Sequence, residues 1–247
     1  MSDRSRPLGS LTMQADLVVF GPHPDDIEIG LGGSVAKHVD LGYAVGLCDL
    51  TRGELGSNGT PEQRLQEAQA AADVLGMRWR RNLGWPDGEI GQSGVDSSQI
   101  RSAAELIRNA RPSVVVIPYW VDRHPDHEAA SRVLREAVFR AGLRRYVADG
   151  EAWRPDWTCH YFINDMSMPS FVIDVSDTYA RKRAALACHQ SQFFPVGEDA
   201  VETRLTGAAF LQMIETRDAH LGAQISTAQA EGLVVKEPLV RPTLLKS

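Results

Sequence analysis

The sequence predicts a single Rossmann-like α/β domain, in which helices flank a mainly parallel sheet and a small elaboration follows at the C-terminal end. Three observations support this fold class. Strand-like and helix-like segments alternate along the chain. Two strongly apolar strands each end in proline, which cannot donate to a sheet ladder. The 247 residues, 43% of them hydrophobic, are enough for one large core, so a second domain is not required.

Composition narrows the class of protein. The net charge of −6 argues against a nucleic-acid-binding surface. Residues 1–12 are polar and lack the apolar core of a signal peptide, so we expect a disordered tail before a domain over 13–247. No segment approaches the ~18 consecutive apolar residues of a membrane span. The three widely spaced cysteines, Cys48, Cys159 and Cys188, indicate reduced thiols in a cytoplasmic protein.

The first strand is predicted to end at Gly21-Pro22, because glycine permits a sharp exit from the sheet. A helix over 27–41 follows and ends at Gly42, with small residues where it must lie close to the first strand. Further strands are predicted over 44–50, 80–83, 114–117 and 171–175. Further helices are predicted over 61–75, 96–110, 126–141, 178–189 and 205–223. The segments 84–94 and 190–204 receive no assignment.

The turn after the first strand carries His23, Asp25 and Asp26 at the sheet edge where α/β proteins bind ligands. Acidic residues at a helix start can cap free amides, which explains one of the two aspartates but not both. An imidazole and a carboxylate are typical zinc ligands, and the adjacent carboxylate would then be free to act as a base. Pyrophosphate binding is disfavoured, because these carboxylates occupy the place where its anionic groups would lie.

The turn after strand 114–117 repeats this design with His124, Asp126 and His127. Each turn delivers His-Pro-Asp and places a further ligand-capable residue at the fourth position. If the two strands are near neighbours in a parallel sheet, the two turns meet at one edge. A lone surface histidine would be the ordinary explanation of either turn, and the match between the two favours a metal site.

The segments at 21–30, Gly-Pro-His-Pro-Asp-Asp-Ile-Glu-Ile-Gly, and at 122–127, Asp-Arg-His-Pro-Asp-His, resemble the PIG-L/LmbE-like zinc deacetylases. Further stretches at 48–60, 141–144 and 191–193 resemble the bacillithiol-biosynthesis branch. This resemblance implies a hydrolase that removes the acetyl group of N-acetylglucosaminyl-malate. The alternatives are a deacetylase of other N-acetylglucosamine compounds, such as chitin fragments or another thiol precursor, and a non-catalytic sugar-binding module that keeps the metal as a clamp.

The resemblance also implies roles for individual residues. His23, Asp26 and His127 would hold Zn²⁺, Asp25 would be the base, and His124 and Asp126 would assist. Three protein ligands leave one position open, whereas a structural zinc is usually closed by four, which favours the enzyme over the clamp. A homo-oligomer, a hexamer, is implied as well. Some relatives place a tyrosine hydroxyl in the pocket, where the nearest counterpart in this chain is Phe210.

Three arginines are candidates for binding the two carboxylates of malate, because an acidic protein needs local cations to hold them. Arg52 follows the second strand and enters the neighbourhood of His23, where pairing with a nearby carboxylate is an equally good explanation. Arg123 precedes His124, and Arg154 is a weaker third candidate.

Overall fold

The computed structural model describes residues 13–92 and 98–238, so the expected tail over 1–12 lies outside the described residues. Within those residues, seven strands form one sheet in the order β3-β2-β1-β4-β5-β7-β6. The strands are β1 (Leu17–Gly21), β2 (Val45–Thr51), β3 (Trp79–Trp85), β4 (Val114–Pro118), β5 (Trp157–Tyr161), β6 (Phe171–Asp174) and β7 (Ala230–Val234). The first five in this spatial order are parallel, whereas β7 runs antiparallel to both β5 and β6.

Strand β1 lies between β2 and β4, so the chain changes direction across the sheet at this strand. Leu17 pairs with Val45 on one side and with Val114 on the other. The two strands that end near proline are therefore direct neighbours, and the predicted α/β fold with a mainly parallel sheet is confirmed. The carboxyl ends of β1 and β4 form a switch point, which is where open α/β sheets bind ligands.

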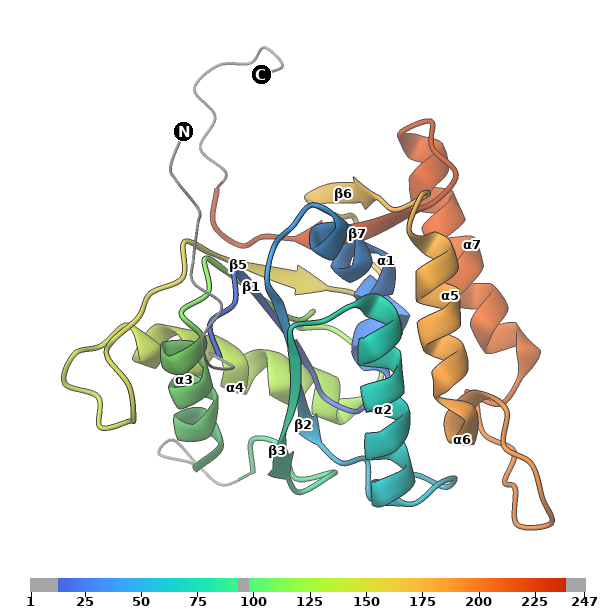
Figure 1. Cartoon of the computed structure of the whole chain (residues 1–247), viewed down its shortest axis with the longest axis horizontal. Coiled ribbons are helices and arrows are strands. Elements are labelled where there is room, and N and C mark those ends of the chain that lie inside the picture. Colours follow the sequence, from blue (N-terminus) through green and yellow to red (C-terminus); the bar gives the residue numbers. More distant parts are fainter. Residues whose placement is uncertain (1–12, 93–97, 239–247) are drawn as a thin grey trace.

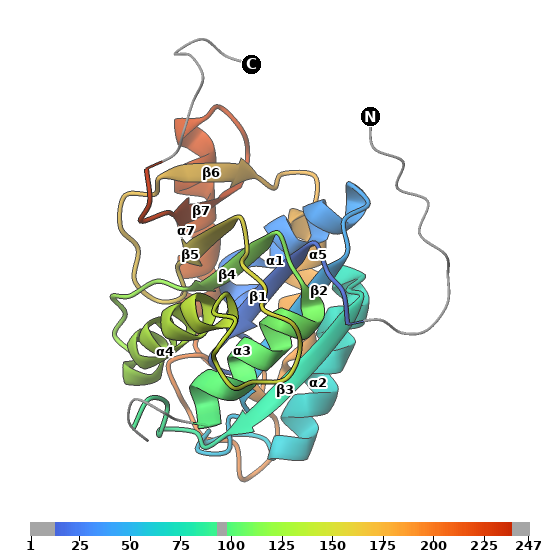
Figure 2. The same ribbon diagram turned by 90° about the vertical axis from the view of Figure 1, so that its left-hand side faces the viewer.

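Helices cover both faces of the sheet (Figures 1 and 2). The helices are α1 (Asp26–Asp40), α2 (Pro61–Leu75), α3 (Ser98–Ala110), α4 (Pro125–Ala141), α5 (Tyr179–Cys188), α6 (Gln190–Phe193) and α7 (Ala208–Gln224). Alternate residues of β1 separate the two layers, because successive side chains of a strand point to opposite faces. Val18 and Phe20 pack in the cluster that contains α3 and α4. Leu17 and Val19 pack in the cluster that contains α1, α2, α5 and α7.

The helix bounds follow from local chemistry. The Thr60 side chain accepts a hydrogen bond from the backbone of Gln63, Pro61 occupies the first turn, and Gly76 ends α2 in the left-handed region at φ +79°. The last long helix begins at Ala208 rather than at the predicted 205. Thr203 and Thr206 form a hydrogen-bonded turn just before it, which delays the helix start.

Two strands were not predicted, β5 and β7. Strand β7 contains the charged residue Glu231, which interrupts the apolar pattern expected of a buried strand, although its side chain is only 1% exposed. Lys182 Nζ lies 2.7 Å from its carboxylate, and the backbone amide of Gly33 donates to it. The ion pair makes a buried carboxylate tolerable at this position. Strand β5 mixes polar and aromatic residues and lacks the valine and isoleucine run of β4.

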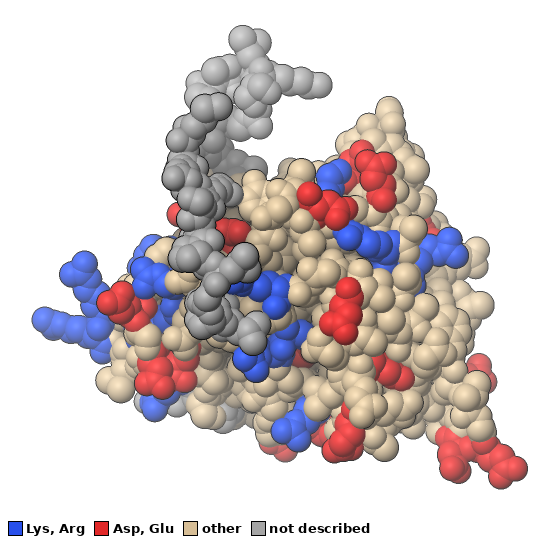
Figure 3. Space-filling model, viewed as in Figure 1, with Lys and Arg blue, Asp and Glu red and all other residues tan. Residues whose placement is uncertain are grey.

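The glycines of α1 allow close packing, but not mainly against β1 as predicted. A Cβ atom on Gly30 would lie 2.3 Å from the Tyr161 ring of β5, and one on Gly32 would lie 2.9 Å from Lys182 of α5. Side chains of both charge signs are interspersed on the face drawn in Figure 3. Within the described residues, no helix is both long enough and apolar enough to cross a membrane.

Candidate functional site

A cleft of about 470 Å³ opens at the carboxyl edge of the parallel strands, within the usual range for small-molecule sites. The turn after β1 and the turn after β4 both line it, as the matched sequence motifs predicted. The loops after β2 and β3 and the C-terminal part of the chain complete its walls. The lining residues include His23, Asp25, Asp26, Leu55, Arg64, Asp87, Arg123, His124, His127, Asn164, Gln192, Arg204 and Phe210.

His23, Asp26 and His127 converge at the base of the cleft. His23 Nδ1 lies 3.1 Å and His127 Nε2 lies 3.3 Å from the same oxygen, Asp26 Oδ2. One donor atom from each residue lies within 4.8 Å of the other two, and all three residues are buried. Two imidazole nitrogens and a carboxylate oxygen are a donor set that suits Zn²⁺ and leaves a coordination position open.

The outer ring nitrogens of these two histidines also face carboxylates. His23 Nε2 lies 3.1 Å from Asp87 Oδ1, and His127 Nδ1 lies 3.1 Å from Asp122 Oδ1. If the outer nitrogens carry the ring protons, both inner nitrogens direct lone pairs toward Asp26 Oδ2, and a cation bound between them would satisfy all three acceptors. Carboxylates that hold the outer nitrogens of metal-binding histidines are a common feature of metal sites. The arrangement therefore fits a divalent cation.

Acidic neighbours dominate the electrostatics of this group. Burial opposes the charged form of His127, yet Asp26 and Asp122 raise the pKa of its imidazole to about 9. Burial also opposes ionisation of Asp122, but the hydrogen bond to His127 lowers its pKa to about 2. The position of Asp122 therefore stabilises positive charge at His127 and makes the imidazole a stronger donor toward a cation.

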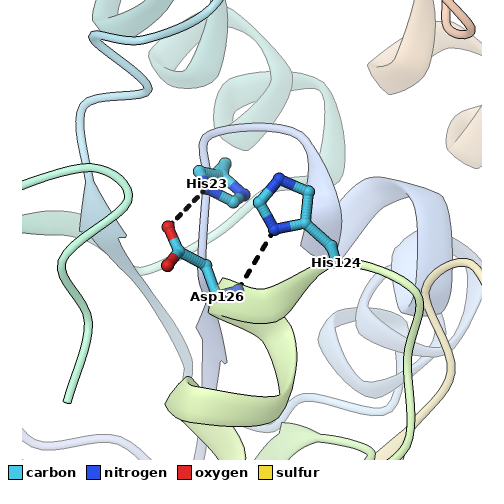
Figure 4. A group of neighbouring side chains, drawn as sticks. All are labelled: His23, His124 and Asp126. Carbon is cyan, nitrogen blue, oxygen red and sulfur yellow. Dashed lines mark hydrogen bonds and ion pairs between the residues drawn. The ribbon is translucent and has the colours of Figure 1, made fainter. Parts of the chain in front are cut away.

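His124 and Asp126 lie beside the group formed by His23, Asp26 and His127. Together with His23 they form a second set of possible metal ligands (Figure 4). His124 Nδ1 accepts a hydrogen bond of 3.2 Å from the backbone amide of Asp126, and this contact caps α4. The ring proton of neutral His124 is thereby placed on Nε2. The carboxylate of Asp126 faces elsewhere, with Oδ2 3.4 Å from His23 Nε2 and accepting from the amide of Gly88.

The protonation of His124 differs from that of the other two histidines. Burial, together with the positive charges of His23 and His127, lowers the pKa of its imidazole. His124 also remains solvent-exposed, whereas His23 and His127 are buried. Its geometry suits a neutral hydrogen-bond donor at the cleft surface better than a metal ligand.

Asp25 is buried and lies at the start of α1, yet its side chain makes no capping hydrogen bond. Its Oδ2 atom lies 3.3 Å from Arg64 Nη2, while Arg64 Nη1 donates to the carbonyl of Gly53. Among the described residues, Asp25 Oδ1 has no hydrogen-bond partner, so one oxygen stays available to the cleft. Capping therefore does not explain this carboxylate.

Sequence reasoning missed Asp87, Asp122 and Arg64. Asp87 lies in the unassigned segment after β3, where it also accepts a hydrogen bond of 2.9 Å from the amide of Leu55. Burial opposes its charge, but the hydrogen bond to His23 lowers its pKa to about 2. A signal existed, since Asp87 follows a parallel strand at the same sheet edge as the two predicted turns.

The predicted arginines are distributed differently. Arg123 lines the cleft, whereas Arg52 is exposed and does not line it. Arg154 packs beside Gly142 and lines a separate depression near Arg135. Arg204, which the sequence did not single out, lines the cleft with Arg123. Phe210 also lines it and packs parallel to Phe193, with ring centroids 6.2 Å apart.

Several known proteins resemble this chain in sequence and in fold. The family model described as PIG-L: GlcNAc-PI de-N-acetylase matches residues 18–138, which include both turns. A diacetylchitobiose deacetylase of Thermococcus kodakarensis is 31% identical in an alignment of 187 positions that covers 70% of this chain and 68% of that protein. A Bacillus cereus protein described as a probable N-acetyl-alpha-D-glucosaminyl L-malate deacetylase 2 is 28% identical over 76% of this chain and 88% of its own length. The crystal structure of a conserved protein from Thermus thermophilus matches with a TM-score of 0.83 and 36% identity, covering 95% of this chain and all of that one.

Proposed function

The chain belongs to the PIG-L family, and from this premise we propose that it hydrolyses the acetamide of an N-acetylglucosaminide. The observation that carries the proposal is the convergence of His23, Asp26 and His127 in a cleft that also presents Asp25 and His124. A structural clamp would need neither an unpaired carboxylate oxygen nor an exposed histidine next to the metal-binding group.

We assign His23, Asp26 and His127 to the metal, with Zn²⁺ as the ion that best suits the donors. A bound divalent cation would polarise the acetamide carbonyl and make a water molecule more acidic. The alternative set of His23, His124 and Asp126 includes an exposed residue whose Nδ1 already caps α4. Only the first set is buried throughout and supported by Asp122 and Asp87.

Asp25 is assigned the proton transfers. Arg64 fixes one of its oxygens, and the other is free to accept a proton from the attacking water. The same carboxyl group then returns the proton to the nitrogen of the departing amine, because amines leave poorly as anions. The Nε2–H group of His124 would donate to the oxyanion that forms on the carbonyl oxygen. Asp126 contributes to this step through its backbone amide, which sets the His124 tautomer.

Two substrate classes follow from the relatives. The malate conjugate is the preferred substrate in the proposal for two reasons. Besides Arg64, which pairs with Asp25, the cleft contains Arg123 and Arg204 for its carboxylates. The Bacillus cereus relative also carries that substrate in its description. Acetylated chitin fragments are the alternative, after the substrate in the name of the archaeal relative. A neutral chitin fragment offers no anion to these arginines.

The test is acetate release from N-acetylglucosaminyl-malate, N,N′-diacetylchitobiose and N-acetylglucosamine. Activity should disappear after treatment with a chelator and return with Zn²⁺. Metal-loaded protein that releases no acetate from any of the three compounds would reject the proposed function. Equal rates on the malate conjugate and diacetylchitobiose would reject the preference for malate while keeping the deacetylase.

A further inference from the structure

Arg123 and Arg204 both line the cleft, and neither forms an ion pair with a described carboxylate. They come from the turn after β4 and from the segment before α7, which are distant in sequence. Among the residues that the structure describes, no carboxylate forms an ion pair with either of them. By contrast, Arg64 and Arg80, which lie deeper in the protein, are each paired with aspartate or glutamate. Two cations beside one cleft repel each other, and an anion bound there would be attracted to both.

Arg204 is held in place. Its Nη1 donates to Asn164 Oδ1 at 2.5 Å, and its guanidinium carbon lies 5.1 Å from the centre of the Phe210 ring. Neither contact removes its charge, because an amide oxygen and an aromatic face are neutral. Such fixation lowers the conformational entropy that Arg204 would lose when it binds a ligand.

The segment that carries Arg204 is also anchored. The Asn58 side chain donates to the carbonyl of Val201 at 2.8 Å and accepts from the amide of Val201 at 2.9 Å. Asn58 itself is 7% exposed, and its carbonyl accepts from Gln192. These contacts tie the segment before α7 to the loop after β2, so Arg204 is presented to the cleft by a defined backbone.

The two guanidinium groups influence one another. Burial and the positive charge of Arg123 both lower the pKa of Arg204. Asp165 and Asp122 act in the opposite direction, and an anion bound in the cleft would relieve the repulsion that remains between the two arginines. Asn164 also contacts Asp122, the residue that holds His127, so the arginine pair adjoins the metal-binding group rather than a remote surface.

We propose that Arg204 and Arg123 form a subsite for carboxylate groups on the aglycone of the substrate and so determine specificity for anionic N-acetylglucosaminides. The inference rests on the proposed function and deepens it, because it selects one substrate class and names the residues that select it. Arg204 replaces Arg52 and Arg154 as the partner of Arg123. Guanidinium groups suit carboxylates because they donate two parallel hydrogen bonds.

The experiment compares two substrates that share the sugar. N-acetylglucosaminyl-malate carries the anionic aglycone, and methyl N-acetyl-α-glucosaminide is its neutral match. The measured quantity is the ratio of their kcat/KM values in metal-loaded wild type, Arg204→Ala, Arg204→Lys and Arg145→Ala. Arg145 is exposed and lines a separate depression. Arg204→Ala should lower the ratio at least about tenfold, mainly through KM of the malate conjugate. Arg204→Lys should recover part of that loss, and Arg145→Ala should leave the ratio unchanged.

An Arg204→Ala variant that loses the same factor on both substrates would overturn the inference while leaving the deacetylase proposal intact. A second readout does not depend on turnover. Calorimetric titration of the reaction product, glucosaminyl-malate, should show binding that weakens at least about tenfold in Arg204→Ala and at high ionic strength. If wild type releases no acetate but binds this product through Arg204, the proposed reaction fails and the subsite stands. Equal affinities of wild type and variant would reject the subsite.

Discussion

Substitution of Asp122 is the sharpest test of the proposed metal ligands, because Asp122 contacts His127 without being a ligand itself. Its Oδ1 lies 3.1 Å from His127 Nδ1, and its carboxylate also accepts from the backbone amide of His124 at 2.8 Å and from Asn164 at 3.0 Å. Asp122→Asn keeps the shape but removes the negative charge. It also turns an amide group toward one of these donors. We expect the variant to bind Zn²⁺ more weakly while keeping the fold.

The size of the effect follows from the contact. Carboxylates that orient a metal-binding histidine typically contribute about 10-fold to 100-fold in metal affinity, or about 1.4–2.7 kcal/mol. Asp122 should lie within this range, because it and Asp26 together raise the pKa of His127 to about 9 against the effect of burial. Without the charge of Asp122, the imidazole becomes a weaker base and its orientation is less fixed.

The assay is competition for Zn²⁺ between metal-free protein and a chromophoric chelator. Asp156→Asn serves as the matched control, since Asp156 is exposed and its side chain has no hydrogen bond or ion pair with the residues that the structure describes. Far-ultraviolet circular dichroism of each variant checks the fold. A wild-type dissociation constant in Asp122→Asn would refute the argument that this carboxylate supports a metal ligand.

Three further predictions concern other parts of the molecule. Asp25→Asn should lower kcat at least ~10²-fold at unchanged zinc content, and near-normal kcat would move the base elsewhere. His124→Ala should lose ~10²–10³ in kcat and retain zinc, whereas His127→Ala should lose the metal; the reverse outcome would exchange the two roles. Burial opposes the charge of Glu28, but Arg80 lowers its pKa from 4.5 to about 2, so its stabilisation is present above 4.5 and is lost as the pH falls toward 2. The difference in urea unfolding free energy between wild type and Glu28→Gln should therefore shrink by up to about 3 kcal/mol between about pH 6 and pH 2, and a constant difference would contradict this.

The sequence was sufficient to predict the fold class, the family and the two turns that converge. The reason is that their signals are local. A short apolar run that ends near Pro22 or Pro118 indicates a buried parallel strand by itself. His-Pro-Asp then follows at the edge that the strand direction defines. Once β1 and β4 are neighbours in the sheet, no other contact between distant segments is needed to bring His23, Asp26 and His127 together.

The remaining parts of the cleft depend on packing between distant segments. Arg64 comes from α2, and its side chain reaches Asp25 only because α2 packs beside α1 in the same layer. Arg204 reaches the cleft through the contacts of Asn58 with Val201. Neither contact can be predicted from the spacing of residues along the chain. Arg52 is an example of a wrong prediction with the same cause. It follows the second strand directly, as expected for a residue of the site, but it does not line the cleft.

The turn after β4 shows how three consecutive residues acquire different tasks from one backbone. Asp122 is buried and faces His127, whereas Arg123 and His124 are exposed to the cleft. Because the first residue points inward and the next two point outward, Asp122 contacts His127 while the guanidinium of Arg123 stays exposed for the proposed contact with a substrate carboxylate. If Arg123 instead paired with Asp122, His127 would lose its support and the cleft would lose a cation. The amide of His124 prevents this by donating to Asp122 Oδ1, which holds the carboxylate on the inner side of the turn. The separation of positive and negative charge in this turn is therefore a property of its backbone hydrogen bonds, and Arg123→Ala should remove the cation while leaving Asp122 in contact with His127.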